Sequence, residues 1–164
     1  MKTKKQKQKN KTRKIKYLTT KAGLALKNQF YLDAAWLISE ILEKRLKSLL
    51  EKVSDERPGA GFTFEQCIKR IKHIHVTGKN QQFKDHFEVK LIDKTRTWKN
   101  QRNTVVKDML DVHVSKARKE KLAMDGIRLL KEWNRSLKNF KSESIKINQE
   151  LPHAITANND LADE

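Results

Sequence analysis

The feature that most constrains the fold is the spacing of apolar residues between Ala22 and Val53. Apolar side chains recur there at intervals of three and four, which places them on one broad face of an α-helix. On the other face, Glu40–Lys44 and Glu43–Lys47 have the four-residue spacing of exposed ion pairs, each worth about 0.2–0.5 kcal/mol. The spacing therefore predicts one long amphipathic helix over this range. Its apolar face comprises Leu26, Phe30, Ala34, Leu37, Ile38, Ile41, Leu42, Leu46, Leu49, Leu50 and Val53.

Turn-forming residues separate this helix from the next one. The run DERPGAG contains a proline and two glycines, which favour turn geometry. A second helix is predicted to begin at Thr63, because Thr63 and Gln66 have the spacing of a capping box. The run VTGKN is the next helix breaker. The narrow apolar face of this second helix comprises Phe64, Cys67, Ile68, Ile71 and Ile74.

The third helical region, over residues 83–113, carries an arginine within its apolar stripe. If the helix is continuous, Arg102 lines up with the apolar side chains, and Lys107 lies about 140° round the helix from it. A fourth helix is predicted over roughly Ser115 to Phe140, and no convincing strand pattern is present. The fold class is therefore all-α, an up-and-down bundle of about four helices with short connections. The third stripe comprises Phe83, Phe87, Leu91, Thr95, Trp98, Arg102, Val106, Met109 and His113, and the fourth comprises Ala117, Leu122, Ile127, Leu130, Trp133, Leu137 and Phe140.

Charge divides the chain into three parts. The 164 residues include 37 lysines and arginines against 20 acidic residues, a formal net charge of +17 that favours polyanions such as RNA. Residues 1–17 have too few apolar side chains to form a core, so we expect a disordered basic arm that contacts nucleic acid. Residues 18–141 form the predicted bundle, and 142–164 a flexible acidic tail. The candidate nucleic-acid-binding residues are Lys4, Lys5, Lys7, Lys9, Lys11, Arg13, Lys14 and Lys16.

Several classes of protein are disfavoured by the composition. Cys67 is the only cysteine, so an internal disulfide is excluded, and no Cys/His spacing indicates a zinc site. No glycine-rich phosphate loop, nucleophile elbow or magnesium-binding carboxylate cluster is present, and we expect no metal and no cofactor. Neither a signal peptide nor a membrane-spanning run is recognisable, so we expect a soluble cytoplasmic protein without membrane contact.

The stretch KNQRNTVVKD, at residues 99–108, resembles the motif of a known family. Together with the long first helix FYLDAAWLISEILEKRLKSLLEK and a final long helix, Arg102 and Asn103 followed by two valines resemble the HEPN superfamily of small all-α domains. That family is typified by the motif R-N-x-x-x-H. Lys107 occupies the histidine position here. The resemblance covers roughly Ala22 to Phe140 and implies a HEPN-like bundle in which Arg102, Asn103 and Lys107 form a degenerate catalytic site.

The resemblance also implies a function. Active members of the family are metal-independent endoribonucleases of toxin–antitoxin or defence systems, and they form dimers that bring two motifs into one cleft. An arginine would stabilise charge on the phosphate, and a histidine would transfer protons. Lysine suits proton transfer poorly, because its ordinary pKa is about 10.4 whereas that of histidine is about 6.5. We therefore expect a weak or inactive ribonuclease that binds RNA, with a homodimer, an antitoxin or another protein as possible partners.

Other interpretations remain open from the sequence. His113 could replace the missing histidine only across an antiparallel dimer, because it lies about 16 Å along the helix from Arg102. Otherwise it is an ordinary histidine at a helix end. The tryptophans Trp36, Trp98 and Trp133 are predicted to be core or dimer-interface anchors, with base stacking open to any that is exposed. The alternative functions are a non-enzymatic basic nucleic-acid-binding protein, in which the arm does the binding, and a helical protein–protein adaptor.

Overall fold

The fold is all-α in this computed structural model, which describes residues 4–54, 59, 61–78, 80–111 and 113–159. The side chains of residues 4, 5, 7, 8, 111 and 144–159 lie outside the described part. Within these ranges there are six helices and no strand, so the predicted all-α class is confirmed and the predicted number of about four helices is wrong. The helices are α1 (Lys4–Lys27), α2 (Tyr31–Val53), α3 (Phe64–Thr77), α4 (Gln81–His86), α5 (Val89–Asp111) and α6 (Lys116–Asn159).

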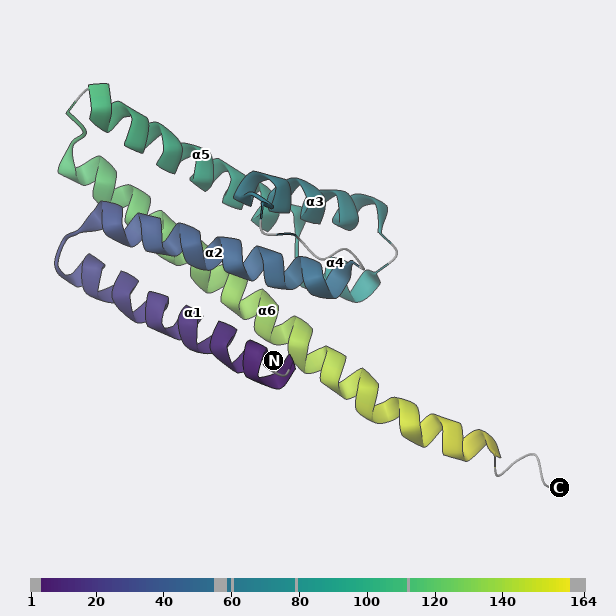
Figure 1. Cartoon of the computed structure of the whole chain (residues 1–164). Coiled ribbons are helices and arrows are strands. Elements are labelled where there is room, and N and C mark those ends of the chain that lie inside the picture. The colour runs from purple at the N-terminus through teal and green to yellow at the C-terminus, as the bar shows by residue number, and fades with distance from the viewer. Residues whose placement is uncertain (1–3, 55–58, 60, 79, 112, 160–164) are drawn as a thin grey trace.

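Helix α2 lies at the centre of the bundle. It packs against α1, α3 and α6, while α5 packs against α3 and α6, and the short α4 contacts α6. Figure 1 shows α6 crossing the bundle along α2 and then extending beyond the other helices. The N-terminal end of α1 lies near the middle of α6 in this view. Three helices, α1, α2 and α6, thus meet on one side of the molecule, and α5 lies on the other.

The single helix predicted over Ala22 to Val53 is in fact two helices, α1 and α2. The chain reverses at Gln29, whose φ of 62° lies in the left-handed region. Phe30 N–H donates to the carbonyl of Ala25 and Gln29 N–H donates to that of Leu26, the bonding pattern of a Schellman motif. Glycine usually occupies the left-handed position of that motif, and here a glutamine does. The reversal therefore lacks the glycine that would have marked it in the sequence.

The basic segment is helical from Lys4 onward, rather than disordered as its composition led us to expect. Residues 15–22 of α1 supply a narrow apolar stripe, in which Leu18 and Ala22 are buried and Ile15 is partly buried against the core. Lysine and glutamine are good helix formers, so the helix continues N-terminally from this docked stripe. Lys11 also forms an ion pair of 2.7 Å with Glu51 of α2.

The third predicted helical region is interrupted at Phe87, between α4 and α5. Phe87 has an extended backbone and caps the end of α4, and its ring lies in the core against Phe83 and Trp133. Helix α5 is then continuous, as assumed, but Val106 is exposed and Val105 is buried instead. Val105 lines a hollow together with Leu122 of α6, so the buried side of α5 is directed toward α6 at this end.

The fourth helix is longer than predicted. It runs to Asn159, through most of the segment that we expected to be a flexible acidic tail. Residues 160–164 lie outside the described part of the chain. Within that part, we find no helix with the length and apolarity needed to cross a membrane.

The predicted capping box and most of the predicted core are confirmed. Thr63 Oγ1 accepts a hydrogen bond from the Gln66 N–H at 3.2 Å, and Gln66 Oε1 accepts one from the Thr63 N–H at 2.7 Å. Both predicted ion pairs on α2 form, with N–O distances of 3.0 Å and 2.7 Å. The largest fully buried side chains come from α2, α3, α4, α5 and α6, together with Phe87. They are Trp133, Phe83, Phe87, Ile38, Ile41, Leu42, Leu46, Leu49, Leu50, Ile68, Ile71 and Ile92.

Two helical glycines should respond in opposite ways to substitution by alanine. A Cβ at Gly126 of α6 would lie 2.6 Å from Trp98 Cζ2, whereas a Cβ at Gly23 of α1 meets nothing within 4 Å. We expect Gly126→Ala to destabilise the protein by about 1–3 kcal/mol, because the ring or the helix must move. Gly23→Ala should stabilise by about 0.5–1 kcal/mol through helix propensity. Urea unfolding of both variants checks the prediction, and the same sign for both would contradict this packing.

Candidate functional site

The Arg102 side chain of the predicted motif lies between α5 and α2. Its NH1 donates a hydrogen bond of 2.6 Å to Ser39 Oγ of α2, and its NH2 donates one of 3.0 Å to Asn103 Oδ1. The guanidinium carbon also lies 4.8 Å from the centre of the Trp36 ring, a cation–π arrangement. Three groups of the protein itself thus engage the guanidinium.

Burial shapes the electrostatics of Arg102. The side chain is half-buried, and burial lowers the pKa of the guanidinium while the nearby carboxylate of Glu43 opposes that shift. Among the described residues, Arg102 Nε has no hydrogen-bond partner. The arginine therefore connects α5 to α2 and remains charged, because an arginine pKa lies far above neutrality.

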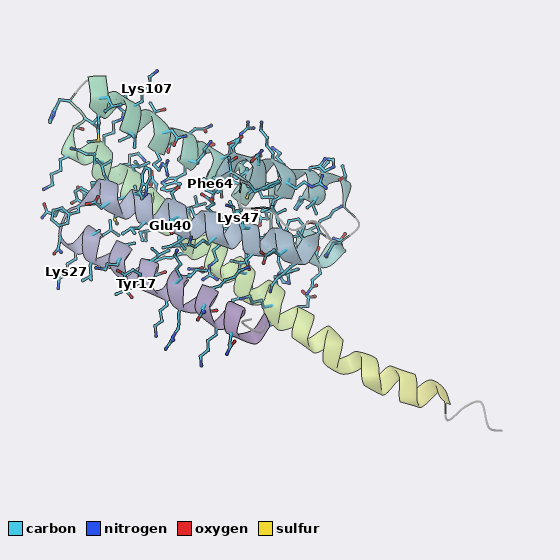
Figure 2. The ribbon with its side chains drawn as sticks, viewed as in Figure 1. Tyr17, Lys27, Glu40, Lys47, Phe64 and Lys107 are labelled. Atoms are coloured by element: carbon cyan, nitrogen blue, oxygen red, sulfur yellow. The ribbon has the colours of Figure 1, made fainter. Side chains whose placement is uncertain are left out.

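Of the other two members of the motif, both within the described residues, Asn103 forms a hydrogen bond with Arg102 and Lys107 forms none with it. Asn103 is exposed and contacts Arg102, but Lys107 is exposed near the C-terminal end of α5, as Figure 2 shows. His113 is also exposed, in the segment between α5 and α6. Among the described side chains, the contacts of Arg102 are with Asn103, Ser39 and Trp36.

The candidate nucleic-acid-binding residues with described side chains all lie on α1. Lys9, Lys11, Arg13, Lys14 and Lys16 are exposed, and Figure 2 shows nitrogen-tipped side chains extending from α1 away from α2. The helical geometry spreads these cations round α1 instead of presenting them on a flexible chain. The side chains of the remaining candidates, Lys4, Lys5 and Lys7, lie outside the described part.

A cavity of about 600 Å³ lies where α1, α2 and α6 meet, and we call it the basic groove. Eight cationic side chains and one carboxylate, Glu51, contribute to its lining. Only the α1 cations of this site were among the candidates from the sequence. The lysines and arginine of α2 and α6 alternate with core residues of two helices that are far apart in the chain, so no local pattern indicates them. The cations of the basic groove are Lys11, Lys14, Lys16, Lys44, Arg45, Lys47, Lys52 and Lys141.

Of the three tryptophans, two are buried and one is exposed. Trp98 and Trp133 are buried, as predicted, with their indole N–H groups donating to the Leu122 carbonyl and to Thr95 Oγ1. Trp36 is 58% exposed, so it is not a core residue of this chain.

Cys67 is a buried thiol without the features of a reactive one. Burial raises its pKa to about 11, and the charge of Glu43 acts in the same direction against the opposing effect of Lys47. A thiol with so high a pKa carries little thiolate near neutrality.

Two of the histidines have partners within the bundle. His86 of α4 pairs with Glu143 of α6, and His75 packs edge-on against Phe83 at 5.6 Å between ring centres. Across the described ranges, no group of three or more histidine, cysteine, aspartate or glutamate side chains is arranged to hold a metal.

Comparison of the chain with protein-family models, with curated proteins and with solved structures found no match.

Proposed function

We propose that this protein is a HEPN-like, RNA-binding helical bundle that binds its target without cleaving it. The observation that carries the proposal is the basic groove, in which eight cationic side chains from three helices surround one cavity. The phosphate backbone supplies most of the affinity of sequence-independent nucleic-acid binding, and it is contacted mainly by lysine and arginine.

An exposed aromatic side chain adds to the support for RNA. Tyr17 of α1 is 60% exposed, and the Lys21 Nζ lies 5.6 Å from the centre of its ring. Figure 2 shows Tyr17 on the side of α1 that faces away from α2. Aromatic rings beside cations provide stacking platforms for the bases of single strands. Single-stranded RNA, whose bases are free to stack, is the form of target that this surface suits best.

The arrangement round Arg102 supports binding rather than cleavage. A general base must reach the attacking hydroxyl and must exchange a proton near neutral pH. Lys107 stands in place of the histidine, and no histidine lies beside Arg102 in the described residues. The toxin–antitoxin or defence setting implied by the resemblance stays a prediction.

The test combines a binding assay with a cleavage assay on one RNA. A labelled single-stranded RNA of mixed sequence is titrated with the full chain at several salt concentrations, and the same mixture is then analysed for cleavage products. We expect micromolar or tighter binding that weakens steeply with salt, with the RNA intact after hours. Absence of binding at moderate salt would refute the proposal, and metal-independent cleavage that Arg102→Ala abolishes would refute its non-catalytic part.

A second candidate function, a helical adaptor that pairs with another copy of this chain, is favoured by apolar exposure. Leu110 is 85% exposed, and Met109 and Trp36 are 44% and 58% exposed at the same end of the bundle. Sedimentation velocity of the wild type and of Leu110→Glu tests this candidate. A dimer that the substitution dissociates would support it, and a monomer at 100 μM, taken as roughly the weak end of specific association, would dismiss it.

A further inference from the structure

The basic groove has an excess of positive charge that Glu51 and the neighbouring carboxylates leave uncompensated. Glu51 pairs with Lys11, Glu40 lies near Lys14 and Lys44, and Glu43 pairs with Lys47, all at N–O distances of 2.7–4.0 Å. The other four cations have no ion pair among the described residues. These four are Lys16, Arg45, Lys52 and Lys141.

The repulsion within this group is visible at Lys52. Partial burial lowers the pKa of its ammonium group, and the neighbouring charge of Lys141 lowers it further. Burial likewise lowers the pKa of Arg45. Like charges held close together at a partly buried site destabilise the protein unless an anion lies between them. The groove thus has the electrostatics of an anion site.

Two residues of the groove lining, Arg45 and Asn134, each carry a buried polar atom without a partner in the described part of the chain. Arg45 Nε is a donor with no hydrogen-bond partner, and Asn134 Oδ1 is an acceptor with none, within the described part of the chain. A buried polar group without a hydrogen-bond partner destabilises the folded state. A phosphate oxygen would satisfy the first atom, and a hydroxyl or N–H group would satisfy the second. A ligand carrying both kinds of group is therefore complementary to this wall of the groove.

We infer that the basic groove binds one nucleotide unit, with its phosphate between Arg45, Lys52 and Lys141 and a hydroxyl or N–H group donating to Asn134. The volume of about 600 Å³ falls within the range of about 300–1,000 Å³ usual for small-molecule sites. Arginine and lysine are the residues that bind phosphate in proteins. The nucleotide comes either from an RNA strand, in which case the inference rests on the proposed function, or from a free mononucleotide.

The experiment measures two ligands against matched variants of the full chain. A fluorescein-labelled single-stranded RNA and adenosine 5′-monophosphate are the probes, followed by anisotropy and by calorimetry. Arg45→Gln removes the buried donor, and the double variant Lys52→Gln/Lys141→Gln removes two solvent-accessible cations with little risk to folding. The control double variant, Lys90→Gln/Lys131→Gln, removes the same charge from exposed positions on α5 and α6 outside the groove.

We expect both groove variants to weaken RNA binding at least tenfold, while the control weakens it less than threefold. Glu51→Gln should strengthen binding, because it removes the one carboxylate of the lining. If the mononucleotide competes with RNA and is lost in the same variants, the site takes a nucleotide from either source. If only the RNA responds, the phosphate is that of the strand.

Two results separate this inference from the proposed function. Mononucleotide binding that the groove variants abolish, in a protein that binds no RNA, would leave the nucleotide site standing and refute the RNA-binding proposal. The opposite result is a wild-type protein that binds RNA and loses equal affinity in the groove variants and in the control variant. That result would overturn the nucleotide site and leave RNA binding as a property of the general surface charge. Circular-dichroism melting of each variant identifies any loss that comes from unfolding.

Discussion

Arg102→Ala is expected to lower the free energy of unfolding by about 2–3 kcal/mol and to change RNA affinity less than threefold. The substitution removes a hydrogen bond from a charged donor to Ser39, of a kind worth about 1.5–3 kcal/mol, and a cation–π contact with Trp36 worth about 0.5–1 kcal/mol. It also leaves the hydroxyl of Ser39, which is only 5% exposed, without this donor. Urea unfolding monitored by circular dichroism measures the loss.

Double-mutant cycles assign that loss to its contacts. The cycle of Arg102→Ala with Ser39→Ala should show a coupling of about 1–2 kcal/mol, and the cycle with Trp36→Leu a smaller one. Lys107→Ala, on the same helix but exposed, is the matched control and should change stability by less than about 0.5 kcal/mol. If Arg102→Ala left stability unchanged and abolished RNA binding, Arg102 would be an RNA-contacting residue and the structural interpretation would be wrong.

The outcome at α5 shows how far the motif could be interpreted from the sequence. Periodicity correctly placed Arg102 on the buried side of a continuous helix, because intervals of three and four hold wherever a helix is regular. It placed Val106 there too, and that was wrong, because α6 contacts only one side of α5 at this end and Val105 faces it. Periodicity identifies a face, but which part of the face is covered depends on where the neighbouring helix passes.

The reversal at Gln29 illustrates a different reason for failure. Helix ends are recognised by glycine or proline, and this end uses a glutamine in the left-handed conformation. Two helices therefore looked like one. The error concealed the α1–α2 hairpin, and with it the fact that the basic residues of the N-terminal segment lie on a docked helix.

The basic groove could be predicted only in part, because the sequence does not show which helices pack together. The charge of α1 is evident from composition, but Arg45 and Lys141 are separated by almost a hundred residues and meet only because α6 packs along α2. A local pattern cannot show that a surface cation of one helix faces that of another. Net charge indicated a polyanion, and the packing of three helices indicates where it would sit.

A further prediction distinguishes a docked helix from a flexible basic arm. Ala22 is fully buried where α1 packs on the core, so Ala22→Asp should undock α1 and remove one wall of the basic groove. We expect at least a tenfold loss of RNA affinity, although the net charge changes by only one unit. The slope of log affinity against log salt is negative, and its magnitude should decrease by about 2. Three α1 lysines of the groove lose phosphate contacts, and each contact contributes about 0.7 for a single strand.

Leu24→Asp provides the matched control for this substitution. Leu24 is 50% exposed on α1, so the same carboxylate is added one half-turn away without disturbing the docked face. Its affinity should fall less than threefold, and its salt slope should stay close to that of the wild type. Equal behaviour of Ala22→Asp and Leu24→Asp would mean that the lysines act as an arm whose position is immaterial. A selective loss with Ala22→Asp would mean that the bundle binds RNA through the geometry of the groove, because both variants carry the same charge.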